Sequence, residues 1–138
     1  MLNRITHSTI YVKDQNESLR FYTEILGFEV RNDVTNGDFR WLTVGLPSQP
    51  GFEIVLFPLK ADGTFLTEDD VKTLTKLAEN GKLGTPVIIT PDIYKTYEEF
   101  KVKGVEFPSP PNEQPWGIDA VFKDNNGNLY SLQQEGHM

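Results

Sequence analysis

One pattern occurs twice in this chain, and it limits the possible folds more than any other feature of the sequence. An alternating segment is followed by an acidic residue that can cap a helix, an apolar stripe at helical spacing, and a glycine that can end the helix. Asp92 lies 78 residues after Asp14, and Gly104 lies 77 residues after Gly27. We therefore predict a tandem repeat of two similar modules.

The first module opens with a strand, predicted over residues 5–12, whose side chains point alternately to opposite faces. One face of this strand carries His7, Thr9 and Tyr11. Asp14 or Asn16 can cap the helix that follows, because either side chain accepts hydrogen bonds from the first unpaired N–H groups of a helix. The module thus presents a polar strand face that is free to line a pocket.

Alternation and turn residues predict further strands in both modules. In the first module they cover residues 28–31, 39–44 and 52–57. In the second module they cover residues 87–90, 105–107, 119–123 and 129–133, with residues 108–117 as a proline-rich loop. Residues 59–84 form a connector whose helix is capped by Thr67. We expect this helix on the surface, with a lid over the pocket as the alternative.

Composition and charge exclude several classes of function. The chain has 138 residues and a formal net charge of −7, which disfavours nucleic acid and anionic membrane surfaces as partners. Its apolar runs fall short of the ~20 residues of a membrane span. Cysteine is absent, which excludes disulfide and thiolate chemistry, and the sequence has no nucleophile elbow or glycine-rich phosphate loop. We expect a cytoplasmic protein with a small-molecule partner.

Two motifs carry a family resemblance. His7, the sequence YVKD at residues 11–14 and the sequence FYTEILGFE at residues 21–29 form the first motif. The sequence AVFKDNNGNLYSL at residues 120–132 forms the second. Together they resemble the vicinal oxygen chelate superfamily, which includes glyoxalase I, extradiol dioxygenases, fosfomycin-resistance enzymes and bleomycin-resistance proteins. The resemblance covers the chain except the connector.

This resemblance implies an α+β fold of tandem βαβββ modules that form a curved, partly open mixed β-barrel with flanking helices. Residues 1–138 would be a single domain, with module one at 1–58, the helical connector at 59–84 and module two at 85–135. By the same analogy, the two modules would enclose a pocket lined by the inward strand faces. Relatives usually form two-fold dimers, so a homodimer is expected.

The metal enzymes of this superfamily place His or Glu ligands at matching points of both modules. His7 occupies the first-strand position, whereas the fourth-strand position falls at Val55 and the last-strand position at Ser131. The equivalent of His7 in module two is Pro86 or Thr85. A hard divalent ion needs several oxygen or nitrogen donors, so no metal cofactor is expected.

Other donors lie close to the usual ligand positions. Glu53 is two residues before Val55, and Gln133 is two residues after Ser131. A shift of two residues in strand register would give a metal site of His7, Glu53 and Gln133. Glu113, in the proline-rich loop, is a further candidate.

The candidate ligand-binding residues are aromatic or polar, apart from Val55, and are predicted to face the pocket. They are His7, Thr9, Tyr11, Trp41, Glu53, Val55, Phe57, Trp116, Ser131 and Gln133. For the aromatic residues the alternative is ordinary core packing, and for His7 it is a neutral imidazole hydrogen-bonded to the pocket wall. Inside a cavity Glu53 would need Arg40 or Arg31 as a partner, or a raised pKa.

Two functions follow from these observations. The first is a glyoxalase/bleomycin-resistance-like protein that binds a small organic molecule without the usual four-ligand metal site. The alternative is a metal-dependent lyase, dioxygenase or transferase with an unusual coordination set that includes His7.

Overall fold

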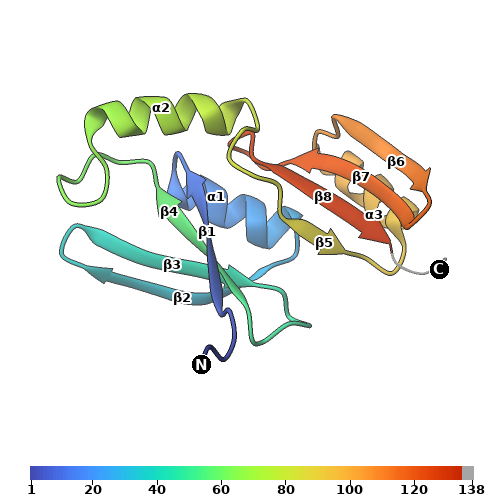
Figure 1. Cartoon of the computed structure of the whole chain (residues 1–138), viewed down its shortest axis with the longest axis horizontal. Helices are drawn as coiled ribbons and strands as arrows, with labels where there is room; N and C mark the ends of the chain where they lie inside the picture. The colour runs from blue at the N-terminus through green and yellow to red at the C-terminus, as the bar shows by residue number, and fades with distance from the viewer. Residues whose placement is uncertain (135–138) are drawn as a thin grey trace. The chain divides into compact units, whose positions relative to one another are not determined.

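The computed structural model describes residues 1–134, and these form two compact units, residues 1–76 and the part from residue 77 onward. Each unit is built on one four-stranded mixed sheet (Figure 1). The predicted α+β fold with a duplicated βαβββ pattern is therefore confirmed. The expected end of module two, residue 135, lies outside the described residues. Within residues 1–134 the helices are too short or too polar to cross a membrane.

The sheet of the first unit has the strand order β1-β4-β3-β2. Its strands are β1 (His7–Val12), β2 (Glu29–Asn36), β3 (Phe39–Gly45) and β4 (Glu53–Pro58). β1 runs parallel to β4, whereas β3 is antiparallel to both of its neighbours. The first strand of the module therefore pairs with its last.

The sheet of the second unit repeats this topology, with the order β5-β8-β7-β6. Its strands are β5 (Val87–Ile89), β6 (Ser109–Gln114), β7 (Gly117–Lys123) and β8 (Leu129–Gln134). β5 is parallel to β8, and β7 is antiparallel to its two neighbours.

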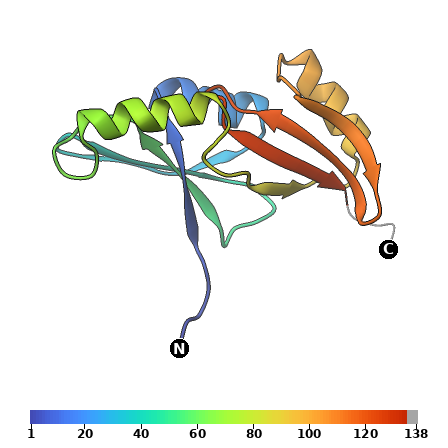
Figure 2. The ribbon, with the colours of Figure 1, turned by 45° about the horizontal axis from the view of Figure 1, so that its top comes forward.

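One helix packs on each sheet. α1 (Gln15–Arg20) and the following π-helical turn η1 (Phe21–Ile25) contact β4 and β2, and α3 (Ile93–Val102) contacts β6, β7 and β8 (Figures 1 and 2). Asp14 and Asp92 cap α1 and α3 as predicted, each accepting from a backbone N–H three residues later.

The core between η1 and its sheet consists of Tyr22, Leu26, Phe28, Leu42, Val44, Ile54 and Leu56. Each such side chain contributes about 1.5–3 kcal/mol by leaving water.

The connector helix α2 (Glu68–Glu79) begins with the predicted cap. Thr67 and Asp70 bond reciprocally: the Thr67 hydroxyl accepts from the Asp70 N–H at 3.1 Å, and the Asp70 carboxylate accepts from the Thr67 N–H at 3.0 Å. Two otherwise unpaired N–H groups of the helix start are satisfied in this way.

One predicted strand is wrong. Residues 105–107 are not a strand, and the strand is instead β6, within the segment predicted as a loop. Pro110 and Pro111 lie where the pairing of β6 with β7 shifts register, between Ser109 and Asn112. Their missing N–H groups cost no ladder hydrogen bond at this irregularity, so the strand tolerates them.

The turn between β7 and β8 is buried and polar. Asp124 accepts from the backbone N–H groups of Asn126 and Asn128 at 2.8 and 3.0 Å, and all three residues are buried. The next glycine, Gly127, has φ +102° and lies against the end of α2, where an added Cβ would be 2.7 Å from the Glu79 carbonyl oxygen. The glycine of this motif thus allows the hairpin turn to approach the end of α2 closely.

We expect Gly127→Ala to destabilise the protein by more than about 2 kcal/mol, because it combines a positive φ with a backbone clash. Gly104→Ala is the matched control, since its φ is +89° but nothing lies within 4 Å of an added Cβ. It should cost about 1–2 kcal/mol. Urea unfolding measures both, and equal losses would show that the contact with α2 contributes nothing.

Candidate functional site

The face of the first sheet that lies away from α1 carries most of the predicted site residues. Alternation and the β1–β4 register place their side chains together, with Glu53 opposite His7, Val55 opposite Thr9 and Phe57 opposite Tyr11. Thr43 of β3 pairs with Val55 and joins the same face. We call this surface the front face; its members are His7, Thr9, Tyr11, Asn32, Phe39, Trp41, Thr43, Glu53, Val55 and Phe57.

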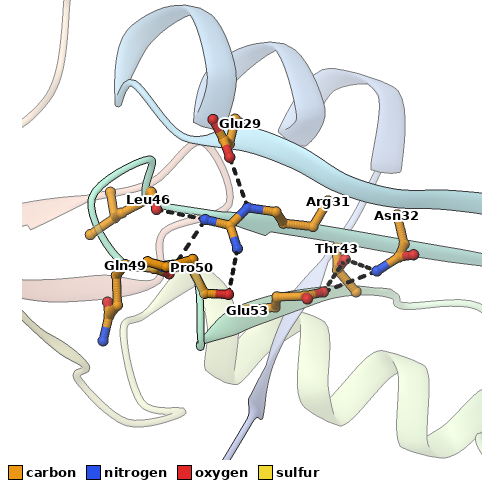
Figure 3. Close-up of polar contacts among 8 residues, drawn as sticks. All are labelled: Glu29, Arg31, Asn32, Thr43, Leu46, Gln49, Pro50 and Glu53. Atoms are coloured by element: carbon orange, nitrogen blue, oxygen red, sulfur yellow. Dashed lines mark hydrogen bonds and ion pairs between the residues drawn. The ribbon is translucent and has the colours of Figure 1, made fainter.

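A carboxylate lies at the polar end of the front face. Glu53 Oε1 accepts from the Thr43 hydroxyl at 2.7 Å and from the Asn32 amide at 3.1 Å (Figure 3). His7 Nε2 lies 3.4 Å from the same oxygen. Thr43 is fully buried and the Glu53 side chain is 20% exposed. The carboxylate is therefore held by the sheet, with part of it accessible.

A β-bulge brings Asn32 to this carboxylate. Val30 pairs with Val44, but the next partner, Thr43, is opposite Asn32, which leaves Arg31 as the extra residue. Without the bulge Arg31 would face Thr43, and the Asn32 side chain would point to the other face.

The Arg31 side chain fixes the loop that leads into β4. Its guanidinium donates to the carbonyl oxygens of Leu46, Gln49 and Pro50 at 2.6, 3.3 and 3.1 Å, and to Glu29 at 3.0 Å (Figure 3). A Cβ on Gly45 would lie 2.7 Å from the guanidinium carbon, so only glycine leaves room for this arrangement. Because β4 starts directly after the loop, Arg31 helps to set the position of Glu53.

The arginines suggested by the sequence are not hydrogen-bonded partners of Glu53. Arg40 instead donates to both carboxylate oxygens of Asp33, at 2.8 and 2.9 Å. The expectation of an Arg40 partner is therefore wrong, and Arg31 acts on Glu53 only as a nearby charge.

The pKa of Glu53 is lowered, not raised. The Thr43 hydrogen bond is the largest cause, and with the smaller effects of Asn32, His7 and Arg31 it outweighs the opposing effect of burial. Hydrogen bonds to the ionised form favour it, so Glu53 is a carboxylate at neutral pH.

His7 links the carboxylate to the aromatic part of the front face. Its Nδ1 lies 2.8 Å from the Thr6 hydroxyl, and its ring centroid lies 5.8 Å from that of Trp41. When the hydroxyl donates to Nδ1, the hydrogen of the neutral imidazole is on Nε2, the nitrogen that lies 3.4 Å from Glu53 Oε1. The imidazole thus has a polar partner on each side and an aromatic neighbour.

The other end of the front face is aromatic. Phe57 contacts Tyr11 and Phe39, with ring centroids 5.8 Å away in both cases. Phe65, from the segment before α2, stands edge-on to Phe57 at 5.7 Å while 63% of it remains exposed. Such edge-to-face pairs contribute about 0.5–1.5 kcal/mol beyond their buried area.

Asp62 shapes the segment that carries Phe65. One of its carboxylate oxygens accepts from the N–H groups of Thr64, Phe65 and Leu66 at 2.9, 2.8 and 3.2 Å. These backbone hydrogen bonds lower the pKa of Asp62. The exposed Phe65 is therefore held in place by its own segment.

The remaining predicted site residues lie in the second unit. Ser131 and Gln133 share a face of β8, where the Gln133 amide donates to the Ser131 hydroxyl at 3.1 Å. Trp116 lies in the exposed turn between β6 and β7, and Glu113 lies in β6.

A metal ion needs several donor side chains that converge on one point. Within residues 1–134 there is no group of three or more His, Cys, Asp and Glu side chains that could hold one. His7 and Glu53 are adjacent, but Val55, at the usual fourth-strand position, is a buried apolar residue. The first unit therefore offers two donors to a metal, fewer than the usual set.

Comparison with known proteins gives consistent results. A family model described as Glyoxalase/Bleomycin resistance protein/Dioxygenase superfamily matches residues 4–132. The uncharacterized protein YurT of Bacillus subtilis (strain 168) is 35% identical over 133 residues, which cover 96% of this chain and 99% of YurT. UcmS2 is 41% identical, and its crystal structure has a TM-score of 0.91, covering 96% of this chain and 98% of UcmS2. TnmS3, an antibiotic binding protein from Streptomyces sp. CB03234, shares the fold at 24% identity, with a TM-score of 0.76 and 98% coverage of both chains.

The environment of Glu53 predicts a pH-dependent stability. Because its folded pKa is lowered, the contribution of Glu53 is fully present above the unfolded pKa, near 4.5, and is lost as the pH falls through the folded value. We expect Glu53→Gln to cost about 1–2 kcal/mol at pH 7 and progressively less below pH ~4.5.

Urea unfolding of both proteins from pH 7 to about 3 measures this difference. The same pair compared in a Thr43→Val background is the control, because the largest cause of the lowered pKa is then absent. A difference that stays constant with pH, or that is unchanged in the Thr43→Val background, would contradict the assignment.

Proposed function

Because the chain belongs to the Glyoxalase/Bleomycin resistance protein/Dioxygenase superfamily, we propose that it is a binding protein for a small organic molecule. The proposed site is the front face of the first unit together with Phe65, with Glu53 and His7 at the polar end and Phe57 and Phe65 at the aromatic end. The binding proposed here does not use the four-ligand metal site of the superfamily's enzymes.

The observation that carries this proposal is the exposed aromatic surface beside a fixed carboxylate. Trp41 is 36% exposed and Phe65 is 63% exposed, although both residues are already held by ring contacts on the front face. Ligand sites combine such apolar area with a few placed polar groups that set orientation. A flat organic molecule covering these rings would remove apolar surface from water at about 25 cal/mol per Å².

The solved structures support the same class of function. TnmS3 is an antibiotic binding protein, so the fold suits the capture of organic molecules. At 24% identity, TnmS3 shows only that the two proteins share a fold, and its ligand is not transferred to this chain. The fold also serves several reactions, so the proposal depends on the residues of the front face.

Metal ligation is the second candidate function, and one distance favours it. His7 Nε2 lies 3.4 Å from Glu53 Oε1, so these two side chains could contribute to a coordination set. A bound divalent metal would act as a Lewis acid on a substrate oxygen. Against this candidate, the described residues hold no group of three or more His, Cys, Asp and Glu side chains that could bind a metal.

We also propose a second copy of the chain as a protein partner. In the described part of each unit, the sheet order leaves β1 and β2, or β5 and β6, as edge strands. Unpaired strand edges are usually covered in soluble proteins, and a homodimer is one way to cover them.

Added divalent metal should leave the melting temperature unchanged. A ligand that binds only the folded state stabilises it by about 2.7 kcal/mol at a hundred times its Kd. We therefore expect coincident melting curves with zinc, nickel or manganese and with chelator. A chelator-sensitive melting temperature that is lost in His7→Ala and Glu53→Ala would establish the metal-dependent alternative.

Removing the exposed rings should weaken the binding of a neutral aromatic probe. We expect Trp41→Ala and Phe65→Ala each to raise the Kd of naphthalenemethanol by about threefold to tenfold, since the loss of a ring contact costs about 0.5–1.5 kcal/mol. Titrations followed by amide NMR measure the Kd. Tyr94→Ala, which removes an exposed aromatic ring on α3, is the control and should leave it unchanged. Equal effects of all three variants would argue against the front face.

A further inference from the structure

We infer that Glu53 makes the front face selective for an organic cation, a flat aromatic molecule that carries an ammonium, amidinium or guanidinium group. This inference rests on the proposed binding function and names the ligand class of the same site. It depends on how the hydrogen bonds of this carboxylate are distributed between its two oxygens.

All polar contacts of the Glu53 carboxylate within the described residues converge on one oxygen. Thr43, Asn32 and His7 approach Oε1 at 2.7, 3.1 and 3.4 Å, whereas none of the hydrogen bonds and ion pairs of the described chain reaches Oε2. A carboxylate has about four acceptor positions. The second oxygen therefore retains its capacity to accept, on a side chain that is only 20% exposed.

The negative charge of Glu53 also lacks a dedicated cationic partner in the described residues. The Thr43 hydroxyl and the Asn32 amide are neutral donors, and His7 is cationic only when protonated. Arg31, whose charge acts on Glu53, directs its N–H groups to three carbonyl oxygens and to Glu29. A ligand cation would complete this site by neutralising the carboxylate.

The surroundings strengthen an interaction with a cation. Val55, the next residue of β4 on the front face, is buried and apolar. Partial burial lowers the effective dielectric, which increases the attraction between opposite charges. Trp41, beside His7, is 36% exposed, and tryptophan is the best aromatic partner for a cation.

The carboxylate is already ordered before a ligand arrives. Thr43 is fully buried, and Asn32 donates to both the Thr43 hydroxyl and Glu53, so the three side chains hold one another. Little side-chain entropy is then lost when a cation binds. The same fixed charge, together with a net charge of −7 for the chain, would repel an anionic ligand.

Three probes built on one naphthalene ring test the inference: naphthylmethylamine, naphthalenemethanol and naphthoate. They differ chiefly in the charge of the substituent, so their Kd values, from amide NMR titration, isolate the contribution of Glu53. We expect wild-type protein to bind the amine about tenfold more tightly than the alcohol, the effect of one charge-assisted hydrogen bond. Naphthoate should bind most weakly.

The variant Glu53→Gln should bind the amine and the alcohol equally. The matched control is Glu24→Gln, which removes one negative charge from the exposed side of η1. It should keep the full preference for the amine, because its charge is not part of the front face. Amide spectra recorded before each titration show whether the variants are folded.

The possible results separate the two claims. If all three probes bind wild type with similar Kd values, or if Glu53→Gln keeps the preference, the cation inference is wrong while the proposed function stands. If none of the probes binds, the proposed function fails as well. If Glu53→Gln does not fold, the wild-type Kd values for the amine and the alcohol are measured at low and at high ionic strength. Salt screens charge interactions, so the preference for the amine should shrink at high ionic strength. A preference that does not change with salt overturns the inference.

Discussion

The parallel pairing of β1 with β4 is the constraint on which the site depends. One backbone hydrogen bond lies at each end of this pairing. At one end the Glu53 N–H donates to the Thr6 carbonyl at 2.9 Å, and at the other end the Leu59 N–H donates to the Val12 carbonyl at 2.8 Å. Because side chains alternate along a strand, this register puts Glu53 beside His7 and turns Leu56 toward the helix. A slip by one residue would bury the carboxylate in the core.

Features determined by neighbouring residues were predictable from the sequence, whereas features determined by distant pairing were not. The caps at Asp14 and Asp92 depend on atoms three residues away, and both are present as predicted. The strand β6 was missed because its prolines argue locally for a loop, while its pairing with β7 across the turn decides the conformation. The strand at β6 therefore forms because of its pairing with β7, and its own residues do not favour it.

The same distinction applies to the site. Period-two alternation was sufficient to group His7, Thr9 and Tyr11, but the partners of Glu53 come from other strands. Asn32 faces the carboxylate only because Arg31 forms a bulge, and the sequence gives no local signal for the bulge except a charged residue in an alternating run. Phe65 was missed because a polar segment, organised by Asp62, carries it to Phe57.

The two sheets share one topology, but their chemistry differs. The pair of residues that begins the β1–β4 ladder is His7 and Glu53, whereas the corresponding β5–β8 ladder begins with Val87 and Ser131. The fold therefore does not require a carboxylate or an imidazole at this point of the ladder. A partly buried charge has a desolvation cost, and in the first unit a buried threonine and a bulged asparagine offset that cost. These features are not needed to build the sheet, and a ligand that uses the charge, as proposed for the front face, would account for them.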